Sequence, residues 1–155
     1  MLTKPVADLL DSKRIPYQLM THARAYTAQG VAASLHVSGW EFAKSVVVRT
    51  EDGRRLMAVV PGSRHLDLKA LGGLVGSSVE LLPEPEMARL FPGSEAGAEP
   101  PFGNLYQLPV YVDESLARDQ QIVFNAGSHV EAVRMKYADW ARLVQPVIAR
   151  IASSH

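Results

Sequence analysis

The residues with the clearest capacity for chemistry begin a valine-rich segment, Ala43-Lys44-Ser45-Val46-Val47-Val48. Three consecutive β-branched residues predict a strand. Because side chains alternate across a strand, Lys44 shares one face with Val46 and Val48. Its ammonium group can reach water from the end of the strand, or it can lie in a partly dry cleft. The second arrangement requires another part of the chain to form the cleft.

A stretch rich in glycine and proline, residues 92–104, could form such a cleft. Glycine lets the main chain approach a ligand and present N–H groups, which suits a carbonyl oxygen or a phosphate. Pro100-Pro101 would stiffen that presentation. Long loops of this kind are more often functional or disordered than plain connectors, although a plain surface excursion is the alternative.

Other candidate residues have equally simple structural explanations. His22, close to Tyr26-Thr27, can be a strand-end histidine with local hydrogen bonds, and Asn125-Ala126-Gly127-Ser128 can be an ordinary turn. The five histidines are scattered without the spacing of metal ligands, so we expect no metal site. The G-x-S-x-G, Walker, H-E-x-x-H and G-x-G-x-x-G motifs are absent from the sequence.

Length and charge restrict the class of protein. The 155 residues predict one domain, 1–155, that is long enough to bury a core. Sixteen basic and sixteen acidic residues cancel, which argues against a broad electrostatic surface for DNA or membranes, although a local basic patch could meet a few phosphates. There is no cysteine, no evident signal peptide and no apolar run of membrane-spanning length, so we expect a cytoplasmic protein.

The pattern of apolar residues predicts an α+β fold with a mixed sheet and flanking helices. Asp52-Gly53 predicts a hairpin between two strands, Asp67 is a candidate helix cap, and Pro146 should kink or restart a final helix. The expected strands are 15–20, 44–49, 56–60, 78–82, 110–112, 121–124 and 129–135. The expected helices follow Pro5, Thr27, Asp67 and Pro83, and a last one runs from Tyr137 to Ile151.

Several of these segments, taken in order, resemble one family. They are His22, Tyr26-Thr27-Ala28, residues 43–48, Ala58-Val59-Val60-Pro61, Leu66-Asp67-Leu68, the G-x-x-x-P-x-G loop from Gly97 to Gly103, residues 112–116 and Phe124-Asn125-Ala126-Gly127. The chain resembles the YbaK-type aminoacyl-tRNA deacylases, which are related to the editing domain inserted in bacterial prolyl-tRNA synthetase. The match covers about residues 15–145, and the lysine combined with the glycine loop is its most specific part.

The resemblance implies a trans-editing enzyme that hydrolyses the ester of a mischarged tRNA. It implies proline tRNA carrying a small wrong amino acid such as alanine or cysteine, since an apolar site discriminates weakly between such side chains. It also implies a largely antiparallel, partly barrel-like sheet, no cofactor, and attack by water aided by a ribose hydroxyl of the tRNA. The catalytic roles fall to Lys44 and to the main chain from Gly97 to Gly103. The residues implied for substrate binding are His22, Tyr26, Pro101, Phe102, Asn125, Gly127 and His129.

Other functions are compatible with the same residues. The chain could be a non-catalytic module that binds tRNA acceptor ends or a synthetase, and prolyl-tRNA synthetase is the partner that the resemblance implies. A small-molecule ester or amide hydrolase is a third alternative, without a sequence feature of its own. The presence of Lys44 favours the deacylase.

Overall fold

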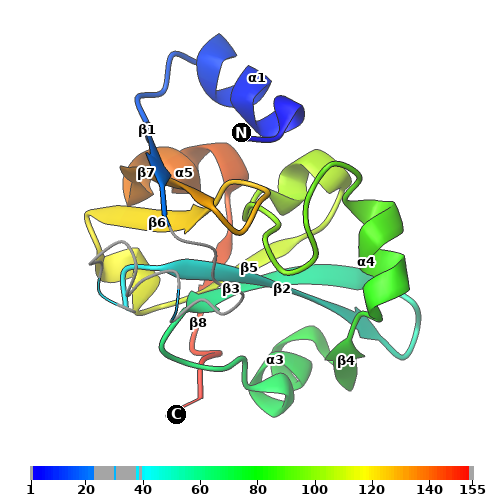
Figure 1. Ribbon diagram of the computed structural model, residues 1–155. Coiled ribbons are helices and arrows are strands. Elements are labelled where there is room, and N and C mark those ends of the chain that lie inside the picture. Colours follow the sequence, from blue (N-terminus) through cyan, green and yellow to red (C-terminus); the bar gives the residue numbers. More distant parts are fainter. Residues whose placement is uncertain (1, 23–29, 31–37, 39, 154–155) are drawn as a thin grey trace.

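Two β-sheets and four α-helices make up the described part of the chain. The computed structural model describes residues 2–22, 30, 38 and 40–153 (Figure 1). One sheet is antiparallel and three-stranded, in the order β1 (Gln18–Thr21), β7 (Glu131–Lys136) and β6 (Gln121–Asn125). The other is mixed and five-stranded, in the order β4 (Val79–Leu81), β2 (Ala43–Thr50), β3 (Arg55–Pro61), β5 (Val110–Asp113) and β8 (Val147–Ala149). The α+β prediction is therefore confirmed.

The helices lie around these sheets. They are α1 (Lys4–Ser12), α3 (Leu68–Val75), α4 (Glu84–Leu90) and α5 (Tyr137–Val144), with short 3-10 helices η1 (Gly103–Tyr106) and η2 (Leu116–Arg118). Among the described residues, no helix is long and apolar enough to cross a membrane. The helix expected after Thr27, together with Tyr26, falls outside the described residues.

The main core lies between the two sheets. Residues from α1, α5 and both sheets contribute to it, including Leu10, Val47, Phe124 and Trp140. The sheets meet at a single parallel bridge in the described chain, between Phe42 and Val123, and they do not close into a barrel. The five-stranded sheet is thus covered on one face by the three-stranded sheet (Figure 1).

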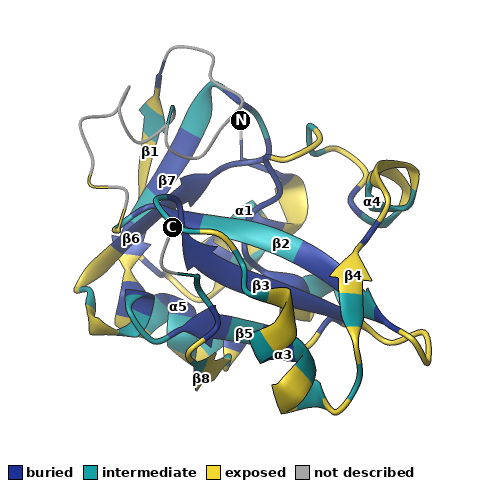
Figure 2. Cartoon of the chain, turned by 90° about the horizontal axis from the view of Figure 1, so that it is seen from below, coloured by how far each residue is buried: buried dark blue, intermediate teal, exposed yellow. Residues whose placement is uncertain are grey.

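A second core covers the other face of the five-stranded sheet. It joins Val48, Ala58 and Val60 to Leu71 of α3 and to Ile151 near the C-terminus. β3 is consequently buried along nearly its whole length, whereas α3 and β4 present exposed outer faces (Figure 2). Alternate residues of β2 serve the two cores, as the period of a strand requires.

Local signals in the sequence account for the β2–β3 hairpin and for α3. Gly53 takes a left-handed conformation with φ of 87° in the predicted Asp-Gly turn. The Asp67 side chain accepts a hydrogen bond from the Ala70 N–H, and α3 ends at Gly76, whose φ is 75°. The cap and the glycine stop are the expected ways to satisfy the ends of a helix.

The predicted C-terminal helix is wrong beyond Val144. Gln145 adopts a left-handed conformation with φ of 53°, and Val147–Ala149 forms β8, parallel to β5. Pro146 lacks the N–H that a continuing helix needs, and the pairing with β5 satisfies the main chain that follows. A restart as a strand was not part of the expectation.

The segment after β8 is fixed to the sheet by Asp113. One carboxylate oxygen accepts the N–H groups of Ile151 and Ala152, both at 2.9 Å, and the other accepts the N–H and hydroxyl of Ser115. Burial acts to raise the pKa of Asp113, but these four hydrogen bonds outweigh it and hold the pKa below its usual value.

Replacing Asp113 with Asn should destabilise the protein in a pH-dependent way. The folded pKa lies below the unfolded value of about 3.9, so the stabilisation is full above the unfolded pKa and is lost as the pH falls through the folded pKa. We expect a loss of about 1–3 kcal/mol at neutral pH, which shrinks as the pH falls below about 4. Urea unfolding at several pH values measures it. The exposed control Asp8→Asn should show no comparable change, and an equal effect in both variants would contradict the assignment.

Gly103→Ala should destabilise the core, because an added methyl group would lie 2.7 Å from Cγ2 of Val110. Overpacking of this kind typically costs about 1–3 kcal/mol. Gly73→Ala is the control, since Gly73 is an exposed residue of α3 with no atom within 4 Å of an added Cβ. That change should stabilise the protein by up to about 1 kcal/mol. Thermal or urea unfolding of both variants measures the difference, and opposite signs are expected.

Candidate active site

Lys44 is a half-buried cation near the start of β2, where β4 leaves one edge of the strand unpaired. It pairs with Val60 of β3 on one side, whereas β4 pairs with β2 only from Val48 to Thr50. Burial lowers the pKa of the Lys44 ammonium, and no described residue forms an ion pair or hydrogen bond with it. Because removing a charge from water without a counter-ion is unfavourable, this group is suited to an anionic or strongly polarised ligand.

The glycine-rich loop is attached to the strand that carries Lys44. The Ser45 hydroxyl donates a hydrogen bond of 3.0 Å to the main-chain oxygen of Glu99. Two main-chain hydrogen bonds fix the other side of the loop: Glu95 N–H donates to the Gly127 oxygen at 2.8 Å, and Gly127 N–H donates to the Ala98 oxygen at 3.0 Å. Residues 95–99, which we call the glycine turn, therefore lie between β2 and the end of β6.

Two glycines make this attachment possible. Gly97 and Gly127 have φ values of 84° and 100°, a conformation that other residues adopt only with strain. An added Cβ at Gly127 would also lie 2.7 Å from Cγ2 of Thr3. The turn predicted for Asn125-Ala126-Gly127-Ser128 begins one residue later, since Asn125 is the last residue of β6 and pairs with Ala132. Gly127, in the bend that follows, holds the glycine turn in place.

His129 packs beneath the glycine turn. Its main-chain N–H donates to a carboxylate oxygen of Glu95 at 3.1 Å, and its ring Nε2 lies 2.7 Å from the Ala96 oxygen. Since a carbonyl oxygen only accepts, Nε2 is the protonated nitrogen of the ring. The ring carbon Cε1 would be 3.6 Å from a Cβ at Gly97. His129 is therefore buried against the residue at which the glycine turn bends.

Asn125 and Lys44 occupy corresponding places on neighbouring segments. Phe42 and Val123 form a parallel bridge, and Lys44 and Asn125 each follow two residues later. Asn125 is buried, and its Oδ1 has no hydrogen-bond partner in the part of the chain that the structure describes. An acceptor of this kind is available to a donor group of a ligand.

His22 lies near the same turn. It follows β1, is buried, and its main-chain N–H donates to the Val130 oxygen at 2.8 Å. This bond continues the pairing of β1 with β7 and places His22 next to the segment that carries His129.

A cavity of about 360 Å³ opens along the free edge of β2. Ser45 and Val46, the two residues that follow Lys44 in β2, both contribute to its wall, whereas Lys44 itself does not line it. Its remaining lining comes from the glycine turn and from the β4–α4 segment, namely Val47, Leu81, Leu82, Glu84, Met87, Ala96, Gly97 and Glu99.

Pro101, Phe102 and Gly103 lie away from this cavity, in the main core. The Pro101 oxygen accepts a hydrogen bond of 2.9 Å from the Trp140 indole, and Phe102 meets Phe124 edge to face with ring centroids 5.6 Å apart. Gly103 begins η1, where the space beside Val110 admits no side chain. The second half of the G-x-x-x-P-x-G motif therefore anchors the loop, and packing explains these residue types.

Two residues of the site were missed by sequence reasoning. Ser45 fixes the glycine turn, and Glu99 places a carboxyl group in the wall of the cavity. The sequence contained one usable signal, since Glu99 is a charged residue within an otherwise apolar run, Ala98 to Phe102. Among the described residues, no group of three His, Asp or Glu side chains is arranged to hold a metal ion.

Comparison with known proteins identifies the family. The profile of the aminoacyl-tRNA editing domain matches residues 22–143, which include the glycine turn, Lys44 and His129. The chain is 26% identical over 142 residues to the multifunctional Ser/Thr-tRNA deacylase ProXp-y of Escherichia coli K12, covering 89% of this chain and 85% of that protein. It is 28% identical over 123 residues to EbsC of Enterococcus faecalis V583, whose name proposes deacylation of Cys-tRNA(Pro) and Cys-tRNA(Cys); the alignment covers 77% and 74% of the two chains.

Solved structures share the fold. A proposed trans-editing enzyme for prolyl-tRNA synthetase superposes with a TM-score of 0.83 at 22% identity, over 99% of this chain and 100% of that one. The hypothetical protein APE2540 superposes with a TM-score of 0.87 at 21% identity, over 97% and 100% of the two chains. The family profile covers most of the sequence, and the chain therefore belongs to the aminoacyl-tRNA editing domain family, the YbaK-type aminoacyl-tRNA deacylases.

Proposed function

We propose that this deacylase is a trans-editing enzyme that removes a small wrong amino acid from tRNA, with mischarged proline tRNA as its main substrate. The observation that carries the proposal is the half-buried ammonium of Lys44, which has no ion-pair partner among the described residues. It lies on the strand whose next residue, Ser45, binds the glycine turn. The names of the relatives add serine, threonine and cysteine to alanine as amino acids to be tested. All four side chains are small enough for a cavity of about 360 Å³.

The chemistry is hydrolysis of an ester that is already activated. Water adds to the acyl carbon, the bond from that carbon to the ribose oxygen breaks, and the ribose oxygen takes up the proton, which yields a free amino acid and uncharged tRNA. Negative charge develops on the acyl oxygen during the addition. A fixed positive charge in a partly dry site stabilises that charge, and Lys44 supplies it.

The remaining residues position the ester. The glycine turn, held by Ser45 and Gly127, brings main chain rather than side chain to the acyl group. His22, Asn125 and His129 line the amino-acid side of the site in this proposal, and Pro101, Phe102 and Gly103 act through the packing of the loop. The same proposal makes prolyl-tRNA synthetase a partner that recognises the tRNA body. The chain has a net charge of zero, so its own electrostatic affinity for the tRNA phosphates is modest.

The direct test is a deacylation assay. Proline tRNA carrying alanine, cysteine, serine, threonine or proline is incubated with the protein, and loss of the ester is followed for each. We expect hydrolysis of at least one mischarged tRNA and retention of prolyl-tRNA. Binding of these tRNAs without hydrolysis would instead support a non-catalytic module.

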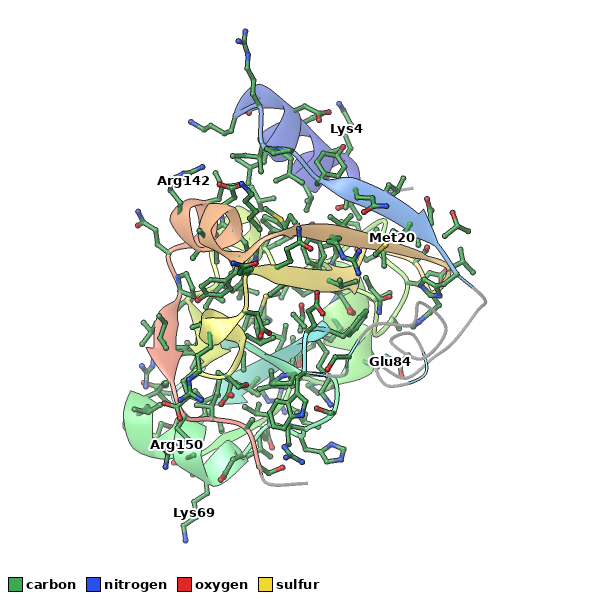
Figure 3. All side chains as sticks on the ribbon, turned by 90° about the vertical axis from the view of Figure 1, so that its left-hand side faces the viewer. Lys4, Met20, Lys69, Glu84, Arg142 and Arg150 are labelled. Carbon is green, nitrogen blue, oxygen red and sulfur yellow. The ribbon has the colours of Figure 1, made fainter. Side chains whose placement is uncertain are left out.

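Lys44→Ala should lower the deacylation rate by more than about 100-fold, because an electrostatic group that acts on the transition state is removed. Lys69→Ala is the control: Lys69 is an exposed lysine on α3 that projects into solvent at the far end of the molecule (Figure 3). Circular dichroism establishes whether both variants are folded. Full turnover by folded Lys44→Ala would rule out this role for the ammonium.

Gly97→Ala should impair deacylation while costing only about 1–2 kcal/mol of stability, since the positive φ is strained but the nearest atom, Cε1 of His129, is 3.6 Å from the added Cβ. Gly53→Ala is matched, because Gly53 has a φ of 87° in the distant β2–β3 turn and no atom within 4 Å. Comparable urea midpoints with loss of activity only in Gly97→Ala are expected. Equal activities at equal stability would show that the conformation of Gly97 does not matter to the reaction.

A further inference from the structure

Glu99 carries a buried carboxyl group that pairs with no lysine or arginine among the described residues. The residue is 6% exposed. Buried carboxylates are usually paired, so this arrangement needs an explanation. The only described groups that bind its carboxylate are main-chain N–H groups, that of Gly97 at 3.1 Å and that of Glu99 itself.

The electrostatic surroundings of Glu99 indicate a missing positive charge. Burial raises the pKa of the carboxyl group, its hydrogen bonds from the Glu99 and Gly97 N–H groups and the charge of His129 act in the opposite direction, and Glu84 raises it further. The net shift is upward, so the ionised form is under-stabilised in the protein alone. A ligand that carries a cation would correct this.

The cavity beside Glu99 has room for such a ligand. Glu99 shares its wall with Gly97 and Ser45, and most of the remaining surface comes from apolar side chains such as Val47, Leu82 and Met87. A site with one anionic wall and apolar neighbours fits a small organic cation rather than a phosphate, which the carboxylate would repel. Glu84 is the first residue of α4 and is exposed to solvent, so it is a weaker partner for that cation.

We propose that the Glu99 carboxylate binds the α-ammonium group of the aminoacyl ester, which makes Glu99 a substrate-recognition residue for a free α-amine. This inference rests on the proposed function. In an aminoacyl ester the amine is bonded to the carbon next to the carbonyl, so a carbonyl placed at Gly97 brings the amine within reach of the carboxylate that binds the Gly97 N–H. The two charges of the substrate's reacting end then face opposite charges, the amine toward Glu99 and the acyl oxygen toward Lys44.

The inference predicts discrimination against acylated amines. N-acetylation removes the positive charge of the amine while leaving the ester intact, and the same holds for formylated or peptidyl esters. An enzyme that binds the charged α-ammonium group hydrolyses aminoacyl-tRNA and does not hydrolyse peptidyl-type esters. Selectivity of this kind comes from a buried charge that would be left unpaired by the wrong ligand.

Glu99→Gln is the sharpest variant, because glutamine keeps an oxygen that accepts the Gly97 N–H and removes only the charge. kcat/KM is measured for alanylated and serylated proline tRNA and for their N-acetylated forms. We expect Glu99→Gln to lower the ratio of the free-amine to the N-acetyl value by about 10- to 100-fold, the worth of a charge-assisted hydrogen bond. The preference of the wild type for the free-amine ester over the N-acetyl ester should also weaken as the pH rises through the pKa of the α-ammonium, about 8 or lower, because the amine then loses its charge.

Glu84→Gln is the matched control, since it removes the same charge from the rim of the same cavity. In Glu84→Gln the ratio of the free-amine kcat/KM to the N-acetyl kcat/KM should change by less than about threefold. Equal losses on both substrates in Glu99→Gln would show a purely structural role for Glu99, and an unchanged ratio, or an equal loss in Glu84→Gln, would overturn the proposal.

A binding measurement separates this inference from the proposed function. Proline tRNA with alanine attached through a 3′-amide resists hydrolysis, and its affinity is compared with that of the N-acetylated amide in wild type and Glu99→Gln. A preference for the free amine that is lost in Glu99→Gln supports the role of Glu99 even if no ester is hydrolysed. Hydrolysis by the wild type without any such preference would refute the role of Glu99 and leave the deacylase function standing.

Discussion

The pair of main-chain hydrogen bonds between Gly127 and the glycine turn holds the site together. Glu95 and Ala98 each bond to Gly127, at 2.8 and 3.0 Å, and these contacts determine where Gly97 bends. The bend itself needs glycine because Gly97 has a φ of 84°, and the His129 ring packs against it. The Ser45 bond then ties the same loop to β2, so the position of the loop relative to Lys44 follows from three hydrogen bonds.

The site contains two opposite charges, and neither has an ion-pair partner in the part of the chain that the structure describes. Lys44 is half-buried and Glu99 is buried, and they do not pair with each other, although the two residues belong to segments joined by the Ser45–Glu99 bond. Burying each charge alone is unfavourable, and two sheets with cores on both faces of β2 and β3 provide the stability that offsets it. Such local conflicts with the rules of stability are typical of functional sites.

Strong local signals predicted the parts of the fold that depend on neighbouring residues. The Asp-Gly hairpin, the Asp67 cap and the valine strand are confirmed because turn chemistry and β-branching act over a few residues. The final strand β8 was missed, since its pairing with β5 is a tertiary contact that outweighs the helical pattern around Pro146. The sequence also did not indicate which half of the G-x-x-x-P-x-G motif lies at the cavity. Gly97 bends at the cavity, whereas Phe102 and Gly103 pack in the core.

The long sequence separation of the contacts at the site determines when the site can form. The contacts that define the site join residues far apart in the sequence, 54 positions between Ser45 and Glu99 and 33 between Ala96 and His129. Closing such large loops is entropically unfavourable and is rewarded only late in folding. During synthesis on the ribosome, the site therefore cannot assemble until His129 has emerged, and shorter nascent chains should have no deacylase activity.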